Sequence, residues 1–111
     1  SSIKTENSDI LHTIERAALA HYQLVWIHPF QDGNGRTARM LMNTIMMGSG
    51  YPPIMIKLED RDNYYEALRT VQHSGDTRAF IYFIYQMAFR SIEEYIGELK
   101  HLMEDNNELE R

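Results

Sequence analysis

The chain has 111 residues, no cysteine, and eleven basic against sixteen acidic side chains, which give a net charge of −5. This length suits one domain with one hydrophobic core, and the absence of cysteine excludes disulfides and thiolate metal sites. The acidic balance argues against nucleic-acid and anionic-membrane partners, no apolar run approaches the ~20 residues of a membrane span, and no signal peptide is recognisable. We expect a cytoplasmic protein with no membrane or nucleic-acid partner.

The first predicted helix follows a polar, frayed start at residues 1–8. Apolar residues recur at spacings of three and four from Ile10 to Val25, which predicts an amphipathic helix capped by Ser8. We expect this helix to end near Trp26, because the residue before a proline, here Pro29, avoids the helical conformation.

A second helix is predicted from about Gly35 to Gly48. It is apolar on nearly all sides, which indicates a central, buried helix; its apolar residues are Met40, Leu41, Met42, Ile45, Met46 and Met47. Gly48-Ser49-Gly50 ends it, and two prolines then predict an extended connector. The segment "IMIK" at 54–57 has the composition of a strand but no partner strand, so we expect an irregular connector.

Two further helices complete the expected fold. One runs from Asp60 to about Gln72, and the other is capped by Asp76 and runs into a polar end at 104–111. No linker or repeat divides the chain. We therefore predict a single all-α domain over 1–111, with a core of about 9–103. Its long amphipathic helices would allow a homodimer.

The loop between the first two helices, "HPFQDGNGRTAR" at 28–39, carries the chemistry. Gly33 and Gly35 permit backbone conformations closed to other residues, so that successive N–H groups form an anion-binding nest. The start of the following helix adds its positive dipole end at the same place. Arg36 and Arg39 follow three residues apart, so both guanidinium groups would reach one polyphosphate.

Two titratable residues precede this nest. Asp32 would repel a bare phosphate but would hold Mg²⁺ beside one, since Mg²⁺ takes one or two carboxylates together with phosphate oxygens. His28 has an ordinary pKa of ~6.5, which suits proton removal at neutral pH. Together these groups predict the transfer of a phosphorus-centred group to a hydroxyl.

Simpler interpretations exist for each part of the loop. Glycine-rich turns between helices are common, and a lone histidine beside a buried helix is more often a packed core residue. His28 and Asp32 would also suit a transition metal, although no third ligand is evident. A Walker loop is excluded, since its "GxxxxGK[ST]" pattern is absent. The combination of all the parts favours the phosphate site.

The stretch "HPFQDGNGRTAR" resembles the signature of the Fic family at every fixed position. The flanking stretches "AALAHYQLVWIHPF", "LMNTIMMGSGYPP" and "NYYEALRTVQHSGDTRAF" are also similar, so the resemblance covers most of 15–97. It implies a compact Fic-type helical bundle with the anion-binding loop between its first two main helices. It also implies transfer of AMP from ATP, with Mg²⁺, to a Ser, Thr or Tyr hydroxyl of a target protein, with release of pyrophosphate.

The resemblance also implies a role for individual residues. His28 would be the general base and Asp32 the magnesium ligand. The remaining positions would bind the nucleotide: Gly33, Asn34 and Gly35 as the anion hole, Arg36 and Arg39 on the outer phosphates, and Tyr64 and Tyr65 near the adenine.

Other positions in the similar stretches are not expected to bind the nucleotide. Phe30 and His21 are expected to be packing residues. The asparagine that the family uses beyond Tyr65 has no evident match, since Gln72 and His73 stand there.

The family's β-hairpin flap and its inhibitory glutamate helix have no recognisable counterpart in the sequence, so we expect weak Mg-ATP binding and poor modification of added protein. The same site would alternatively use another nucleotide or a phosphocholine donor, or remove AMP. A non-catalytic nucleotide-binding interaction module is the remaining alternative.

Overall fold

The computed structural model describes residues 2–27 and 33–109, and in these residues the fold is helical. The elements in chain order are α1 (Ser2–Ile27), α2 (Asn34–Gly48), the short 3-10 helix η1 (Leu58–Asp60), α3 (Arg61–Ser74) and α4 (Arg78–Leu109). No strand occurs in the described parts of the chain, so the all-α prediction is confirmed. None of these helices is both long and apolar enough to cross a membrane.

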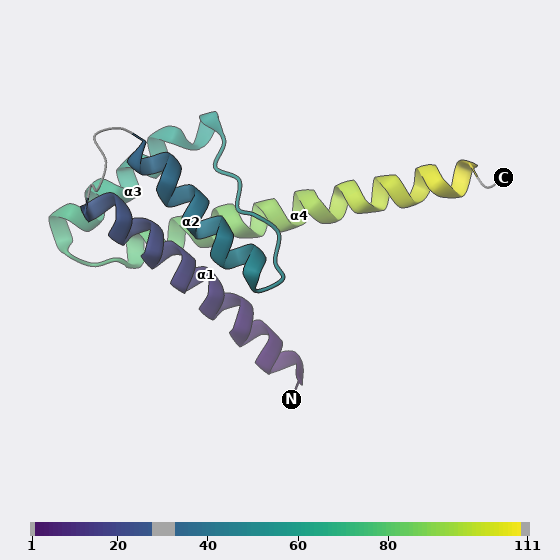
Figure 1. Ribbon diagram of the computed structural model, residues 1–111, viewed down its shortest axis with the longest axis horizontal. Coiled ribbons are helices and arrows are strands. Elements are labelled where there is room, and N and C mark those ends of the chain that lie inside the picture. Colours follow the sequence, from purple (N-terminus) through teal and green to yellow (C-terminus); the bar gives the residue numbers. More distant parts are fainter. Residues whose placement is uncertain (1, 28–32, 110–111) are drawn as a thin grey trace.

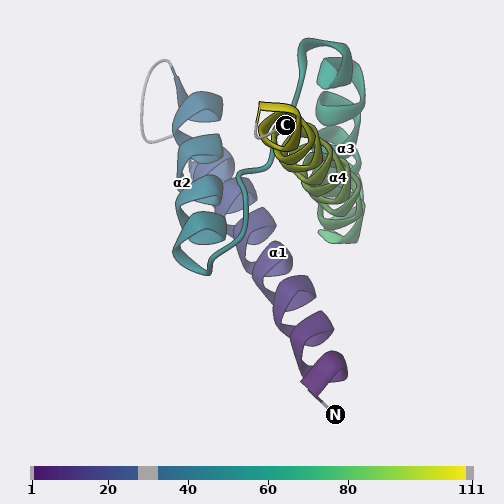
Figure 2. The same cartoon turned by 90° about the vertical axis from the view of Figure 1, so that its right-hand side faces the viewer.

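The helices pack around α1 and α4. Helix α1 contacts α2 and α4, and α3 packs against α4. In Figure 1 the first half of α1 and the second half of α4 extend away from this packed body in different directions. The view turned by 90° shows α2 and α3 on either side of α4 (Figure 2). The connector that follows α2 passes between α2 and α4 in this view. The molecule is accordingly elongated, at 58 × 37 × 22 Å.

The core lies where the four helices meet. Its members come from one face of each helix, as the apolar spacing predicts; they include Ile14, Ala17, Ala18, Met42, Met46, Val71, Phe80, Ile84 and Ala88. Ala17 and Ala18 on α1 are fully buried, and their small side chains suit close approach of a neighbouring helix. The sequence spacing thus predicts the core-facing side of each helix.

Two expectations about the helices are wrong. Helix α1 begins at Ser2 instead of after Ser8, because residues 2–8 contain no proline or glycine to stop it. Helix α2 is buried on one face only: Met40 is 64 % exposed and Met47 54 %, whereas Met42 is fully buried. Since α2 lies at the side of the bundle, it has no second layer to cover its outer methionines.

The connector over 51–57 is irregular, as predicted, because side chains satisfy its backbone in place of a partner strand. The Asn43 side chain accepts from the Ile54 N–H at 2.7 Å and donates to the Ile54 carbonyl at 3.2 Å. The Ser91 hydroxyl accepts from the Met55 N–H at 2.9 Å. Arg90 donates to the Met55 carbonyl at 3.2 Å. This connector carries the chain from the end of α2 to the start of α3.

The end of α3 and the start of α4 lie where the sequence signals predict them. Gly75 has φ 73° and its N–H donates to the Val71 carbonyl at 2.7 Å, which closes α3 in the left-handed conformation that favours glycine. The Asp76 carboxylate accepts from the Arg78 N–H at 3.0 Å, which caps the start of α4.

Candidate functional site

The predicted anion-binding loop ends in an unusual backbone conformation at the start of α2. Gly33 has φ 80° and ψ 14°, in the left-handed region, and the residues after it are helical. The Thr37 N–H donates to the Gly33 carbonyl at 2.9 Å, which is the first hydrogen bond of the helix. A left-handed residue followed by right-handed ones is the geometry in which successive N–H groups converge on an anion. His28 and Asp32 lie outside the described residues.

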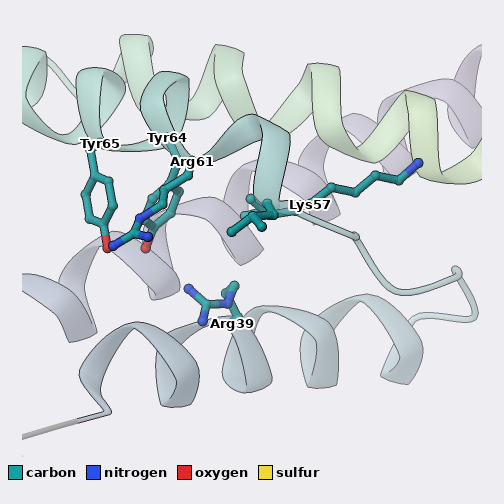
Figure 3. Close-up of a pocket in the computed structure, with 7 residues that line it drawn as sticks. Arg39, Lys57, Arg61, Tyr64 and Tyr65 are labelled. Atoms are coloured by element: carbon teal, nitrogen blue, oxygen red, sulfur yellow. The ribbon is translucent and has the colours of Figure 1, made fainter.

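A cavity of about 330 Å³ opens beside this helix start. It is lined by one residue of α2, three of the connector and η1, and three of α3: Arg39, Ile56, Lys57, Leu58, Arg61, Tyr64 and Tyr65. Figure 3 shows the Arg39 side chain rising from α2 toward Tyr64, Tyr65 and Arg61 on α3. The fold therefore brings together Arg39 of α2 and the tyrosine pair of α3, which the connector and η1 separate in the sequence.

Gly35 connects the helix start to the cavity. A Cβ atom on residue 35 would lie 3.3 Å from Arg39 Nη1 and 3.9 Å from the Tyr64 hydroxyl. A side chain on residue 35 would therefore displace the flexible end of Arg39 by a few tenths of an ångström, whereas glycine leaves that end in place. Arg36, one turn before Arg39, is exposed. Its predicted role on the outer phosphates stays a prediction.

Arg61 is a site residue that the sequence analysis missed. Its guanidinium carbon lies 5.8 Å from the centroid of the Tyr65 ring, and both residues line the cavity. The spacing of four residues between Arg61 and Tyr65 is the one signal that would have indicated their common face. Lys57 was also missed, but its ammonium group turns away from the cavity (Figure 3) and pairs with Glu94 at 2.7 Å.

The two tyrosines have different environments. Tyr64 is 5 % exposed, and its hydroxyl lies 3.1 Å from Nε2 of the fully buried His21. Tyr65 is 44 % exposed, and it also lines a second, largely apolar cavity of about 210 Å³ with Tyr22, Trp26 and Gln72 among its neighbours. Tyr65 is therefore the member of the pair with a face open to a ligand.

Burial and the charge of Arg39 determine the protonation states of His21 and Tyr64. Desolvation by burial, together with the positive charge of Arg39, lowers the pKa of His21 to about 4. Burial raises the pKa of Tyr64, and the nearby Arg39 partly offsets this effect. Both groups are neutral at pH 7, so the cavity keeps the positive charge of its arginines.

The sequence of the chain matches a family model and several curated proteins. Residues 2–46 match the model of the Fic/DOC family. The chain is 53% identical over 93 residues to protein adenylyltransferase Fic of Nematostella vectensis, covering 84% of this chain and 22% of that protein. It is 48% identical over 98 residues to protein adenylyltransferase fic-1 of Caenorhabditis elegans, covering 88% of this chain and 19% of that protein.

Solved structures of a Fic protein are also similar to this chain. A fragment of Fic-1 from C. elegans superposes with a TM-score of 0.74 at 52% identity, covering 80% of this chain and 27% of that fragment. A variant of that fragment gives a TM-score of 0.72 at 50% identity, covering 77% and 26%. The chain belongs to the Fic/DOC family. It spans about a fifth of the length of the curated relatives that it matches.

Proposed function

We propose that this chain is the nucleotide-binding and catalytic core of a protein adenylyltransferase, which transfers AMP from ATP to a Ser, Thr or Tyr hydroxyl of a target protein. One observation carries the proposal: the left-handed glycine that starts α2 is contiguous with a cavity lined by two guanidinium groups and an open tyrosine face. The names of the relatives, protein adenylyltransferases, support the same activity.

The nucleotide would lie along the start of α2 and into the cavity. The N–H groups at Gly33, Asn34 and Gly35 would bind the phosphate that is attacked, since the helix dipole and converging amides favour negative charge there. Arg36 and Arg39 would hold the outer phosphates, and Tyr65 would contact the adenine. The arginine pairs would be charge-assisted and bidentate, which makes them stronger than neutral hydrogen bonds.

The magnesium assignment is part of this proposal and depends on Asp32. In the described residues no group of three or more His, Asp or Glu side chains could hold a metal ion. The proposed Mg²⁺ needs fewer protein ligands, because one or two carboxylates together with phosphate oxygens and water complete its shell. Asp32 directly precedes Gly33 in the chain, so it is the carboxylate next to the phosphate nest. The ion would neutralise phosphate charge when bound.

His28 would act as the general base of the transfer. It would take the proton of the acceptor hydroxyl, whose oxygen then forms a bond to the α-phosphorus of ATP. The bond from that phosphorus to the bridging oxygen of the β-phosphate breaks, and pyrophosphate leaves. Arg39 would stabilise the negative charge that develops on the leaving group, as preorganised donors do in phosphoryl-type transfer.

Labelled ATP tests the proposal. ATP carrying the label in its α-phosphate is mixed with Mg²⁺, the chain and a protein lysate, and ATP labelled in its γ-phosphate is used in parallel. Because poor modification of added protein is expected, we expect a small amount of protein-bound label, from the α-position only, with a mass increase equal to AMP on a hydroxyl residue.

Variants of two histidines complete this test. His28→Ala should lower transfer by about 10² to 10⁴ while ATP affinity stays within a few-fold, because a base acts on the rate and not on binding. His73→Ala, at an exposed histidine on α3, is the matched control. Transfer from the γ-position, transfer only from another donor, removal of AMP, or ATP binding with no transfer would each contradict the proposal.

A further inference from the structure

The proposed reaction gives no role to the imidazole of His21, a buried polar group next to the cavity residue Tyr64. It is fully buried on the core face of α1, between the rings of Tyr64 and Phe80, with centroid distances of 5.6 and 5.0 Å. A ligand in the cavity would therefore meet Tyr64 and not His21. Since an apolar side chain would fill such a position without a polar group to satisfy, the imidazole calls for an explanation.

The Tyr64 hydroxyl links His21 to the cavity. It lies 3.1 Å from His21 Nε2 on one side. On the other side it lies near Arg39, since a Cβ atom on Gly35 would meet both Arg39 Nη1 and the Tyr64 oxygen within 4 Å. Figure 3 shows the Arg39 guanidinium directed toward the end of Tyr64 that bears the oxygen. Three side chains from α1, α3 and α2 thus follow one another from the core to the cavity.

One arrangement of donors and acceptors joins all three groups, and it leaves the second ring nitrogen of His21, Nδ1, buried without a hydrogen-bond partner among the described residues. A guanidinium has only N–H donors, so the Tyr64 oxygen must face Arg39 with a lone pair. The hydroxyl proton is then available to His21, and neutral His21 accepts it at Nε2. His21 is neutral at pH 7 because its burial, with the charge of Arg39, lowers its pKa to about 4. A protonated imidazole would have only donors and would end this arrangement.

We propose that His21 and Tyr64 are positioning residues, in which the hydrogen bond from Tyr64 to His21 fixes the tyrosine oxygen as the acceptor that orients Arg39 into the cavity. The inference rests on the proposed function for the identity of the ligand that Arg39 meets. It gives Tyr64 a role on the arginine in place of the predicted contact with the adenine. Tyr65, with its open face, keeps the contact with the base.

This role concerns the cost of ordering Arg39. A free arginine loses several rotatable bonds when it binds a phosphate, and an acceptor that already holds its guanidinium reduces that loss. The benefit reaches only ligands that extend to Arg39, which in the proposed site means the outer phosphates. The positioning effect therefore separates ATP from AMP, whereas a general loosening of the core would weaken both.

Tyr64→Phe is the central variant, because it removes the oxygen and keeps the buried ring. Isothermal titration of the 111-residue chain with Mg-ATP and with AMP should show ATP affinity about 3- to 10-fold lower and AMP affinity unchanged, as expected for the loss of one hydrogen-bonded oxygen. In an Arg39→Ala background the same substitution should have no further effect on ATP. Tyr82→Phe, at an exposed tyrosine of α4, is the matched control.

A measurement without nucleotide tests the hydrogen bonds directly. Long-range ¹H–¹⁵N spectra of the histidine rings should show His21 protonated at Nδ1 and unprotonated at Nε2, and Tyr64→Phe should shift the Nε2 signal and broaden that of the Arg39 side chain. A proton on Nε2, equal losses for ATP and AMP, or an undiminished loss in the Arg39→Ala background would overturn the proposal. Intact NMR signatures in a chain that binds no ATP would support the positioning and contradict the proposed function.

Discussion

Arg39 of α2 and Arg90 of α4 both lie beside the connector, in very different surroundings. Arg90 donates to the Asp60 carboxylate, at 2.8 Å from Nη1 to Oδ1, and to the Met55 carbonyl, at 3.2 Å. Asp60 is only 6 % exposed, and the pair joins the start of α3 to α4. Arg39 lines a cavity whose described lining residues include no carboxylate and include a second guanidinium, that of Arg61.

The difference separates a structural arginine from a binding one. The half-buried guanidinium of Arg90 has a carboxylate and a carbonyl as partners within the fold, and removing it leaves the buried carboxylate of Asp60 without its counter-charge. A guanidinium at a cavity without a counter-charge has its best partner outside the chain, as an anion. Arg90 therefore stabilises the fold, whereas Arg39 is available to bind a ligand. The feature that distinguishes the two arginines is the buried carboxylate that pairs with Arg90.

Arg90 and Arg39 should differ most in how much each contributes to the stability of the fold. Arg90→Ala should lower the free energy of unfolding by about 3 kcal/mol, because Asp60 stays buried without its partner. Arg39→Ala should change it by less than about 1 kcal/mol, since no carboxylate loses a partner there. Urea unfolding of both variants, followed by circular dichroism, measures this. Similar losses for the two variants would show that Arg39 also belongs to the structural class.

In nucleotide binding the order should be reversed, so that Arg39→Ala causes the larger loss of affinity and Arg90→Ala the smaller. Arg39→Ala should weaken ATP by at least about 10-fold and AMP much less, since a bidentate guanidinium–phosphate pair has no outer phosphate to bind in the monophosphate. Arg90→Ala, compared at a temperature where it remains folded, should bind both as the parent does. Equal losses for ATP and AMP in Arg39→Ala would remove Arg39 from the outer phosphates.

The features that depend on local sequence pattern could be predicted from the sequence. Core faces followed from the spacing of residues such as Ile14 and Ala18, the end of α3 from Gly75, and the unusual backbone before α2 from Gly33. Local rules sufficed there because each signal acts within one or two helical turns.

The remaining parts depend on distant residues and could not be predicted. His21 and Tyr64 are 43 residues apart, and Asp60 and Arg90 are 30 apart. Neither pair has a sequence signal, because the packing of separate helices brings each together. The exposure of Met40 was missed for the same reason: apolar residues on all sides of a helix indicate burial only if other elements cover every side.

The two regions should also lose stability at different pH. His21 has a folded pKa of about 4, below the ordinary value of 6.5, so the unfolded chain binds more protons between these values. Its contribution is therefore complete above about pH 7 and is lost as the pH falls toward 4. The hydrogen bond from Arg90 lowers the pKa of Asp60 below 3.8, so the contribution of that pair is lost only at more acidic pH.

Between pH 7 and 5 we expect the free energy of unfolding to fall by on the order of 2 kcal/mol through His21 alone. His21→Gln should remove most of this dependence, and His73→Gln, at an exposed histidine, should keep it. An NMR titration of the His21 ring in the parent chain checks the cause independently of folding. A ring that titrates near pH 6.5 would contradict the assignment.

Two glycines, like the two arginines, should differ in their role despite a similar local structure. Gly33 and Gly75 have nearly the same left-handed backbone, with φ 80° and 73°, and a Cβ atom on either would meet no described atom within 4 Å. Alanine at each position should therefore lower the free energy of unfolding by about 1 kcal/mol, through backbone strain and not through a clash. Gly75 ends α3 by a hydrogen bond within the helix, whereas Gly33 directs N–H groups toward the proposed phosphate.

Equal strain should thus have unequal consequences for binding. Gly33→Ala should weaken both ATP and AMP, because the amides of the nest meet the phosphate that the two nucleotides share, and Gly75→Ala should weaken neither. Urea unfolding and titration of the two variants at one temperature measure both quantities in the same samples. If Gly75→Ala reduced nucleotide affinity as much as Gly33→Ala, the losses would follow from stability, and the left-handed glycine at α2 would have no separate role in binding the anion.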